Sequence, residues 1–111
     1  MKNTRIMWIE KKEDLSGPAR IGRVTFSKSG KSIHYGGKTF YRLGGHGYKA
    51  NYADEATDEQ YWISGCRKDG RDALYNTDCE IDEDVREEYW TQIRGLPEKV
   101  QVSRFRARGK Y

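Results

Sequence analysis

Short stretches of alternating apolar and polar residues dominate the chain, and glycines or clusters of polar residues separate them. Alternation with a period of two indicates β-strands, because successive side chains of a strand point to opposite faces of its sheet. The pattern predicts strands over residues 5–10, 20–28, 32–35, 38–43, 48–53, 60–65, 78–81 and 98–107. We therefore expect a mainly β protein.

The stretch 19–43 gives the clearest pattern and predicts three consecutive strands. Ser29-Gly30 and Gly36-Gly37 interrupt it, and both pairs suit hairpin turns that require positive φ. Ile21 is out of phase with the alternation later in its strand. A β-bulge at Gly22 would explain the change of phase.

One helix is expected, from Asp82 or Asp84 to Arg94. Asp84 and Glu87 have the spacing of a capping box, and Gly95 suits the position that follows a helix. Acidic residues at the start and Arg94 at the end complement the helix dipole. Apolar residues recur at every fourth position and should face the sheet: Val85, Tyr89 and Ile93.

Short strands, glycine turns and a bulge together favour a strongly curved antiparallel sheet. We predict an α+β, mainly β fold in which this sheet closes toward a small SH3-like barrel, with the helix packed on it. An open α+β sheet is the alternative. At 111 residues the chain should form one domain, with the last few residues loose. The predicted core consists of Val24, Phe26, Ile33, Tyr52, Ile63, Val85, Tyr89 and Ile93.

The composition raises the question of disorder, because 35% of the residues are hydrophobic and 34% are charged. Three Trp, eight Tyr and three Phe argue for a packed core. The sequence has no apolar run of about 18–20 residues and no secretory h-region, so we expect a cytoplasmic protein that does not bind membranes. In that compartment Cys66 and Cys79 should be reduced thiols.

Charge is strongly segregated along the chain. Residues 1–53 hold eleven basic and three acidic residues, residues 54–94 hold five and thirteen, and residues 95–111 hold five and one. In a compact fold these blocks either form opposite poles or neutralise one another.

Three runs carry a resemblance to a known group of proteins: GPARIGRVTFSKSGKSIHY, KANYADEATDEQYWISG and EIDEDVREEYW. In these runs the chain resembles a widespread family of small uncharacterised bacterial proteins. The resemblance covers roughly residues 5–97. It implies a bacterial cytoplasmic domain and brings no catalytic residues with it.

The basic residues of the first half lie among aromatic residues on short strands. Small curved sheets bind single-stranded nucleic acids by pairing a basic groove with aromatic stacking surfaces. This pattern predicts a single-stranded RNA site made of Arg20, Arg23, Lys28, Lys31, Tyr35, Lys38, Tyr41, Arg42 and Lys49. Arg104, Arg106, Arg108 and Lys110 would extend it. The alternative is that the aromatics form core and the cations balance the acidic block.

Protein recognition is the leading hypothesis for function, with RNA binding as the alternative. Aromatic anchors within a charged rim are a common basis of small interfaces. The acidic block predicts a surface for an unknown protein partner, as in an immunity or regulatory protein, made of Trp62, Asp82, Glu83, Asp84, Glu87 and Trp90.

Catalytic and metal signatures are weak, so we expect a non-catalytic module without a cofactor or a metal. His34, His46, Cys66 and Cys79 lack the close-spaced pairs typical of zinc sites. His34 and His46 are the only candidate acid–base pair, and the glycine-rich loop 44–47 matches neither a P-loop nor a dinucleotide fingerprint.

Overall fold

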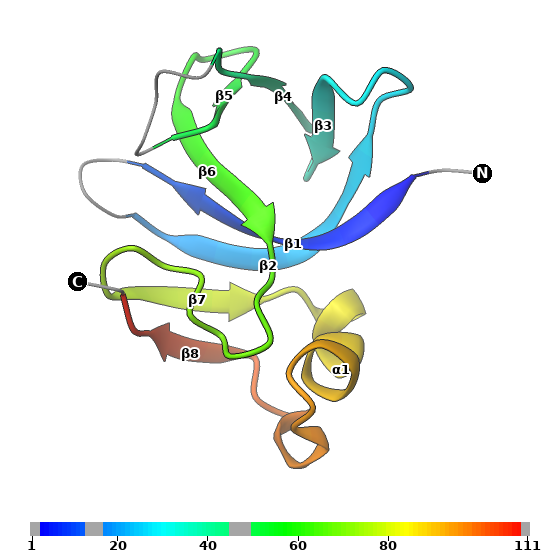
Figure 1. Cartoon of the computed structure of the whole chain (residues 1–111), viewed down its shortest axis with the longest axis vertical. Helices are drawn as coiled ribbons and strands as arrows, with labels where there is room; N and C mark the ends of the chain where they lie inside the picture. The colour runs from blue at the N-terminus through cyan, green and yellow to red at the C-terminus, as the bar shows by residue number, and fades with distance from the viewer. Residues whose placement is uncertain (1–2, 13–16, 45–49, 110–111) are drawn as a thin grey trace.

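Six antiparallel strands close into a barrel, as the sequence predicted for a small SH3-like fold (Figure 1). The structure is a computed structural model and describes residues 3–12, 17–44 and 50–109. Its strands are β1 Thr4–Lys11, β2 Ala19–Phe26, β3 Ser32–Tyr35, β4 Lys38–Arg42, β5 Tyr52–Asp54, β6 Gln60–Gly65, β7 Thr77–Ile81 and β8 Arg104–Ala107. The barrel order is β1-β6-β5-β4-β3-β2, and pairing of β1 with β2 closes it.

A second layer covers the outer side of β1 and β2. It consists of β7, β8 and a helical segment, which lie together on the side of β2 away from the barrel (Figure 1). Strand β7 pairs in parallel with the first residues of β2, whereas β3 pairs with its last residues on the same edge. The edge of β2 therefore forks between the two layers.

Two hydrophobic cores result from this arrangement. The barrel core contains Met7, Ile9, Val24, Ile33, Phe40, Tyr52, Tyr61 and Ile63. The outer core contains Ile6, Trp8, Ala19, Ile21, Ala73, Cys79, Ile81, Val85, Tyr89, Trp90 and Ala107. Six of the eight predicted core residues are buried, while Phe26 and Ile93 are partly buried at the margins of the two cores.

The strand predictions are confirmed for most of the barrel, and the bulge at Gly22 is wrong. Gly30, Gly36 and Gly37 have φ values of 74°, 57° and 77°, as their hairpin turns require. The register of β2 with β1 runs without a break from Thr25 to Ala19. Ile21 is out of phase with Val24 because β2 is buried on both faces: Ile21 faces the outer core and Val24 the barrel core.

The predicted helix lies where expected but is not a regular α-helix. It consists of a 3₁₀ turn η1 Glu83–Val85, a single α-turn α1 Arg86–Glu88 and a π-helical turn η2 Tyr89–Ile93, followed by Gly95 at φ 64°. The capping box is wrong, because the N-cap is Asp82 and makes no side-chain cap hydrogen bond. Its carboxylate is used by Arg20 and Tyr35 instead.

The last predicted strand is only half correct. Residues 98–103 do not form a strand. Glu98 and Lys99 belong to a 3₁₀ turn, η3 Pro97–Lys99, and Val100 and Val102 pack against the outer core before β8 begins. The predicted strand 48–53 begins outside the described residues and continues in β5. None of the helical segments in the described part of the chain has the length and apolar character that a membrane-crossing helix needs.

Candidate functional site

One end of the barrel is open, and its mouth contains a hollow of about 240 Å³. We call this the mouth hollow. Its lining consists of Ile9, Lys11, Pro18, Arg20, Tyr35, Gly36, Lys38, Phe40 and Tyr61. Three of these described residues are cationic, three are aromatic and none is acidic. The hollow therefore combines apolar walls with a positive rim.

The tight turn between β3 and β4 brings Tyr35 and Lys38 to the mouth. These two residues face each other in the β3–β4 register, and Gly36 and Gly37 between them both have positive φ, which glycine adopts without strain. Phe40 on β4 and Tyr61 on β6 meet edge to face, with ring centroids 4.7 Å apart. The Lys38 ammonium lies 6.0 Å from the Tyr61 ring centroid. The aromatic wall is thus fixed by core packing.

A cluster at the fork of β2 holds Tyr35 and Arg20 in place. Arg20 donates to Asp82 Oδ1 from Nε at 2.9 Å and from a terminal nitrogen at 2.6 Å, and the Tyr35 hydroxyl donates to Asp82 Oδ2. Burial and the Asp82 carboxylate raise the pKa of Tyr35, and the same carboxylate raises the pKa of Arg20. Only glycine fits at position 22, because a Cβ there would lie 2.4 Å from Asp82 Oδ2.

The three rim cations are ion-paired with acids outside the hollow, and all remain partly exposed. Lys11 bonds Glu59 at 2.6 Å, Arg20 also bonds Glu80 at 3.1 Å, and Lys38 lies 3.7 Å from Asp54. The Lys11 ammonium lowers the pKa of Glu59. The side-chain exposures of the three cations are 31%, 47% and 50%, so each can still meet a ligand.

The predicted RNA-binding residues are only partly gathered at this site. Arg20, Tyr35 and Lys38 line the mouth hollow, whereas Arg23 pairs with Glu88 of the helical segment at 2.9 Å. The others lie apart from the hollow: Lys28 and Lys31 are exposed in the β2–β3 turn, Arg42 is exposed at the end of β4, and Tyr41 is 38% exposed with its hydroxyl on Asp58. Lys49, like Lys110, is outside the described residues.

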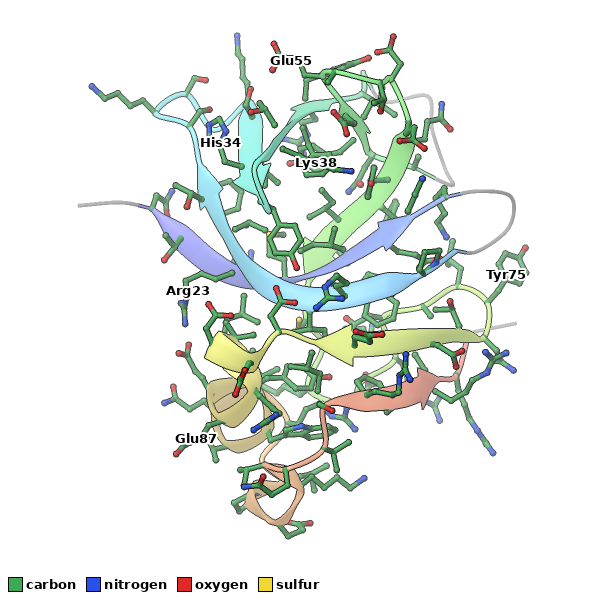
Figure 2. All side chains as sticks on the ribbon, turned by 180° about the vertical axis from the view of Figure 1, so that it is seen from behind. Arg23, His34, Lys38, Glu55, Tyr75 and Glu87 are labelled. Atoms are coloured by element: carbon green, nitrogen blue, oxygen red, sulfur yellow. The ribbon has the colours of Figure 1, made fainter. Side chains whose placement is uncertain are left out.

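The predicted protein-binding residues divide into exposed acids and inward-facing aromatics. Glu83, Asp84 and Glu87 are exposed on the helical segment, in the half of the molecule away from Lys38 (Figure 2). Trp90 is only 2% exposed and donates its indole N–H to the Val102 carbonyl. Trp62 is partly buried against the outer core and donates to Ser64. Asp82 is engaged by Arg20 and Tyr35.

Lys11, Phe40 and Tyr61 line the mouth hollow but were absent from both predicted sites. The signal for Tyr61 was available, since it alternates in phase with Ile63, and both belong to the barrel core. The predicted first strand ended at residue 10, whereas β1 extends to Lys11 and positions its side chain at the mouth.

The candidate catalytic and metal residues are not assembled into a centre. No group of three or more His, Cys, Asp or Glu residues among residues 3–12, 17–44 and 50–109 is arranged to hold a metal ion. The exposed His34 bonds Thr39 at 3.0 Å, and His46 lies outside the described residues. Both cysteines are free, and burial raises the pKa of both thiols, that of Cys66 to about 12. Buried thiols of this kind react slowly, because the thiolate is the nucleophile.

Asp72, in the loop before β7, is a buried carboxyl that should make the stability of the fold depend on pH. Burial raises its pKa from 3.8 to about 6, and its Oδ2 has no hydrogen-bond partner within the described chain. Between these pH values the folded protein holds a proton that the unfolded chain releases, so stability falls as the pH rises from about 4 to 6. Asp72→Asn should raise the free energy of unfolding by about 2–3 kcal/mol at pH 8 and change it little at pH 4.

Urea unfolding at the two pH values measures this effect. Asp69→Asn is the matched control in the same loop, because hydrogen bonds from the Arg71 backbone and the Arg67 side chain lower the pKa of Asp69. Its pH dependence should therefore have the opposite sign. Equal destabilisation of Asp72→Asn at both pH values would contradict the prediction.

The fold and this site define a small SH3-like β-barrel that carries a second β/helical layer and a cation-rimmed hollow at its mouth. Comparison with protein-family models, curated proteins and solved structures finds no match to this chain. The resemblance to a bacterial family thus stays a prediction, and a proposal for function depends on the site itself.

Proposed function

We propose that this protein is a non-catalytic module that binds single-stranded RNA at the barrel mouth. One base would enter the mouth hollow, and the adjacent phosphates would contact the rim. The observation that carries the proposal is an apolar, aromatic-walled hollow whose described lining includes three cations and no acid. Aromatic stacking combined with backbone cations is the common mode of single-strand binding.

The size of the hollow supports a ligand that inserts one flat group. Pockets for drug-sized ligands occupy roughly 300–1,000 Å³. The mouth hollow has about 240 Å³, which suits one planar ring better than a larger ligand. Tyr35 is half-buried and its hydroxyl is held by Asp82, so its ring is already oriented. Stacking on such a ring contributes about 1–3 kcal/mol per base.

The existing ion pairs do not prevent the rim cations from binding phosphate. The Lys11–Glu59 and Arg20–Glu80 pairs are exposed on both sides, and such pairs contribute about 0–1 kcal/mol, so exchanging these carboxylates for a phosphate costs little. Asp54, the partner of Lys38, is buried, and it also accepts a hydrogen bond from the Ala56 backbone N–H at 2.9 Å. Lys38 is the most available of the three, since its distance of 3.7 Å to Asp54 is the longest of the three pairings and its side chain is 50% exposed.

The test is the salt dependence of RNA binding by two single-lysine variants. Fluorescence anisotropy of a labelled, mixed-sequence RNA strand should give an affinity that falls as salt rises, since each phosphate contact on a single strand contributes a log–log slope of about −0.7. Lys38→Gln should weaken binding and make this slope shallower by about 0.7. Lys28→Gln, at the opposite end of β3, removes the same charge and should leave the slope unchanged.

A strand carrying one 2-aminopurine tests base insertion directly, since stacking quenches its fluorescence. The native protein should quench the 2-aminopurine fluorescence. Lys38→Gln should quench it less, in proportion to the smaller fraction of RNA that this variant binds. Binding that is absent at low salt, or insensitive to salt, would overturn the proposal. Equal effects of Lys28→Gln and Lys38→Gln would place the RNA outside the mouth.

Protein recognition through the acidic segment is the second candidate. It is supported by the exposed carboxylates of Glu83, Asp84 and Glu87. Interface energy usually comes from buried aromatic or arginine anchors, and Trp90 packs inward instead. The test compares partner capture by the native protein with capture by a variant in which Glu83, Asp84 and Glu87 are replaced by lysine. Loss of the partner in the variant is expected if this surface binds it. Asp82 should be kept, because its reversal would break its bonds with Arg20 and Tyr35.

A further inference from the structure

A second hollow lies in the outer layer, between the loop 67–72, the end of the helical segment and β8. It has a volume of about 320 Å³. Five cationic side chains from separate parts of the chain line it: Arg71, Arg94, Lys99, Arg106 and Arg108. We call it the arginine groove. The single acid among its described lining residues is Asp69.

Asp69 offers little compensation for these five charges. Its carboxylate accepts hydrogen bonds from the Arg71 backbone N–H at 2.9 Å and from Arg67 Nε at 3.2 Å. These bonds, together with the nearby charges of Arg67 and Arg71, lower the pKa of Asp69, so its single negative charge is shared between its own turn and one cation of the groove. The groove is therefore an electropositive concavity, and such concavities concentrate anions.

The cations of the groove have few carboxylate partners. Arg106 bonds Asp78 at 3.1 Å, with both side chains largely exposed. The side chains of Arg71 and Arg108 make no ion pair or hydrogen bond with residues that the structure describes. Lys99 lies 5.6 Å from the Trp90 ring centroid, a contact that leaves its ammonium donors available.

Arg94 is the fixed member of the set. Its guanidinium carbon lies 5.2 Å from the Trp90 ring centroid, and a terminal nitrogen donates to the Tyr89 hydroxyl at 3.1 Å. On the other side the loop backbone approaches so closely that a Cβ on Gly70, which has φ 74°, would lie 2.4 Å from the guanidinium. Its Nε is buried without a hydrogen-bond partner among the described residues. A guanidinium held in this way loses little freedom on binding an anion.

The arginine groove is distinct from the mouth hollow. Between them, acidic side chains of β7 neutralise the arginines of the neighbouring strands. Glu80 bonds both Arg20 on β2 and Arg104 on β8, at 3.1 and 2.6 Å, while Asp78 takes Arg106. A continuous phosphate track between the two hollows would have to cross this ladder of ion pairs.

We propose that the arginine groove binds a ligand with two or more adjacent phosphate groups. Five cations around one hollow exceed what a single phosphate can engage, whereas a short polyphosphate or consecutive phosphodiesters can contact several of them. Arginine suits this role because its planar fork donates two parallel hydrogen bonds to phosphate oxygens. The inference does not rest on RNA binding at the mouth.

Calorimetric titration of the whole protein with inorganic triphosphate at low ionic strength tests the groove. The double variant Arg71→Gln/Arg108→Gln removes two exposed cations whose side chains make no ion pair or hydrogen bond with the described residues, and should lower the affinity about tenfold or more. Lys28→Gln/Lys31→Gln removes the same charge from the β2–β3 turn and should leave the affinity within about twofold, because exposed charges this far away are screened. The mouth variant Lys38→Gln should likewise have no effect.

Two results would overturn the proposal: no triphosphate binding at low salt, or equal weakening by the two double variants. Competition then identifies the source of the phosphates. Displacement of triphosphate by an RNA strand without a terminal phosphate, still sensitive to Arg71→Gln/Arg108→Gln, supports backbone phosphodiesters as the ligand. Triphosphate binding that such RNA does not displace supports a small polyphosphate. The mouth proposal is tested by RNA binding of Lys38→Gln and the groove proposal by triphosphate binding of Arg71→Gln/Arg108→Gln. A negative result for one proposal therefore leaves the other intact.

Discussion

Replacing Glu10 by glutamine is expected to lower the free energy of unfolding by about 3–5 kcal/mol. The Glu10 side chain is fully buried and lies 3.0 Å from the ammonium of Lys12, whose side chain is only 3% exposed. Glu10 also accepts hydrogen bonds from the Trp8 indole at 3.2 Å and from the Gly17 backbone at 3.4 Å. Glutamine keeps the shape but removes the negative charge beside a buried ammonium, which is the costly part of breaking such a pair.

The neighbouring ion pair provides the control. Lys11 and Glu59 are 2.6 Å apart, with side-chain exposures of 31% and 39%. Glu59→Gln should cost less than about 1 kcal/mol, because solvent screens an exposed pair. Urea unfolding followed by tryptophan fluorescence measures both variants, and Trp8 reports on Glu10 directly. The double variant Glu10→Met/Lys12→Met should recover most of the loss. Equal costs for Glu10→Gln and Glu59→Gln would show that the buried pair is not formed as described.

Tyr89→Ala is expected to cost a similar amount, about 3–5 kcal/mol. The Tyr89 ring is fully buried in the outer core, 5.1 Å from the Trp90 centroid and 6.5 Å from that of Phe105. Removing it leaves a cavity that these large neighbours cannot fill without moving. Loss of a buried aromatic from a close-packed core combines the transfer and cavity costs.

Two further variants separate packing from hydrogen bonding at this position. Tyr89→Phe keeps the ring and removes only the hydroxyl that accepts from Arg94 at 3.1 Å, so about 1 kcal/mol is expected. Gln92→Ala, exposed in the same π-helical turn, should change stability by less than about 0.5 kcal/mol. Denaturant midpoints measure all three variants. A loss for Tyr89→Phe as large as for Tyr89→Ala would assign the energy to the hydroxyl instead of the ring.

Local pattern was sufficient for most of the barrel. The glycine turns and the alternation of apolar residues predict β3 and β6 with their correct bounds, because hairpins are determined by neighbouring residues. The same rule failed at Ile21, since alternation assumes one buried face and β2 has two. The parallel pairing of β2 with β7 joins Ala19 to Cys79, and no local pattern indicates a contact over that separation.

The helical segment shows how a change of winding alters which residues are buried. A spacing of four predicts that Ile93 continues the stripe of Val85 and Tyr89. In the structure the Arg94 N–H bonds the Tyr89 carbonyl, which adds one residue to the bonded turn. Trp90 is buried in the outer core, and Ile93, near the end of this widened turn, lies at its margin. Trp90 lies beside the predicted stripe, so its burial agrees with the sequence pattern, although the predicted partner site also included it.

The mouth hollow was partly predictable and the arginine groove was not. Arg20, Tyr35 and Lys38 came from the basic, aromatic-rich meander, where residues close in sequence are close in space. The groove collects Arg71 and Arg94 from the acidic block 54–94 and Arg106 from the basic block 95–111. Only the tertiary fold brings the cations of an acidic segment next to those of the C-terminal strand.

Strand β2 is shared by the two layers of the molecule, because each of its faces contributes side chains to a different hydrophobic core. Val24 supports one core and Ile21 the other, three residues apart on the same strand. We expect the two layers to unfold together. Loss of the outer layer would expose Trp8 and Ile21 to solvent, and loss of the barrel would remove the strands β1 and β2 against which the outer layer packs. Substitutions and insertions in the turns should therefore be tolerated far better than a deletion at either end of β2.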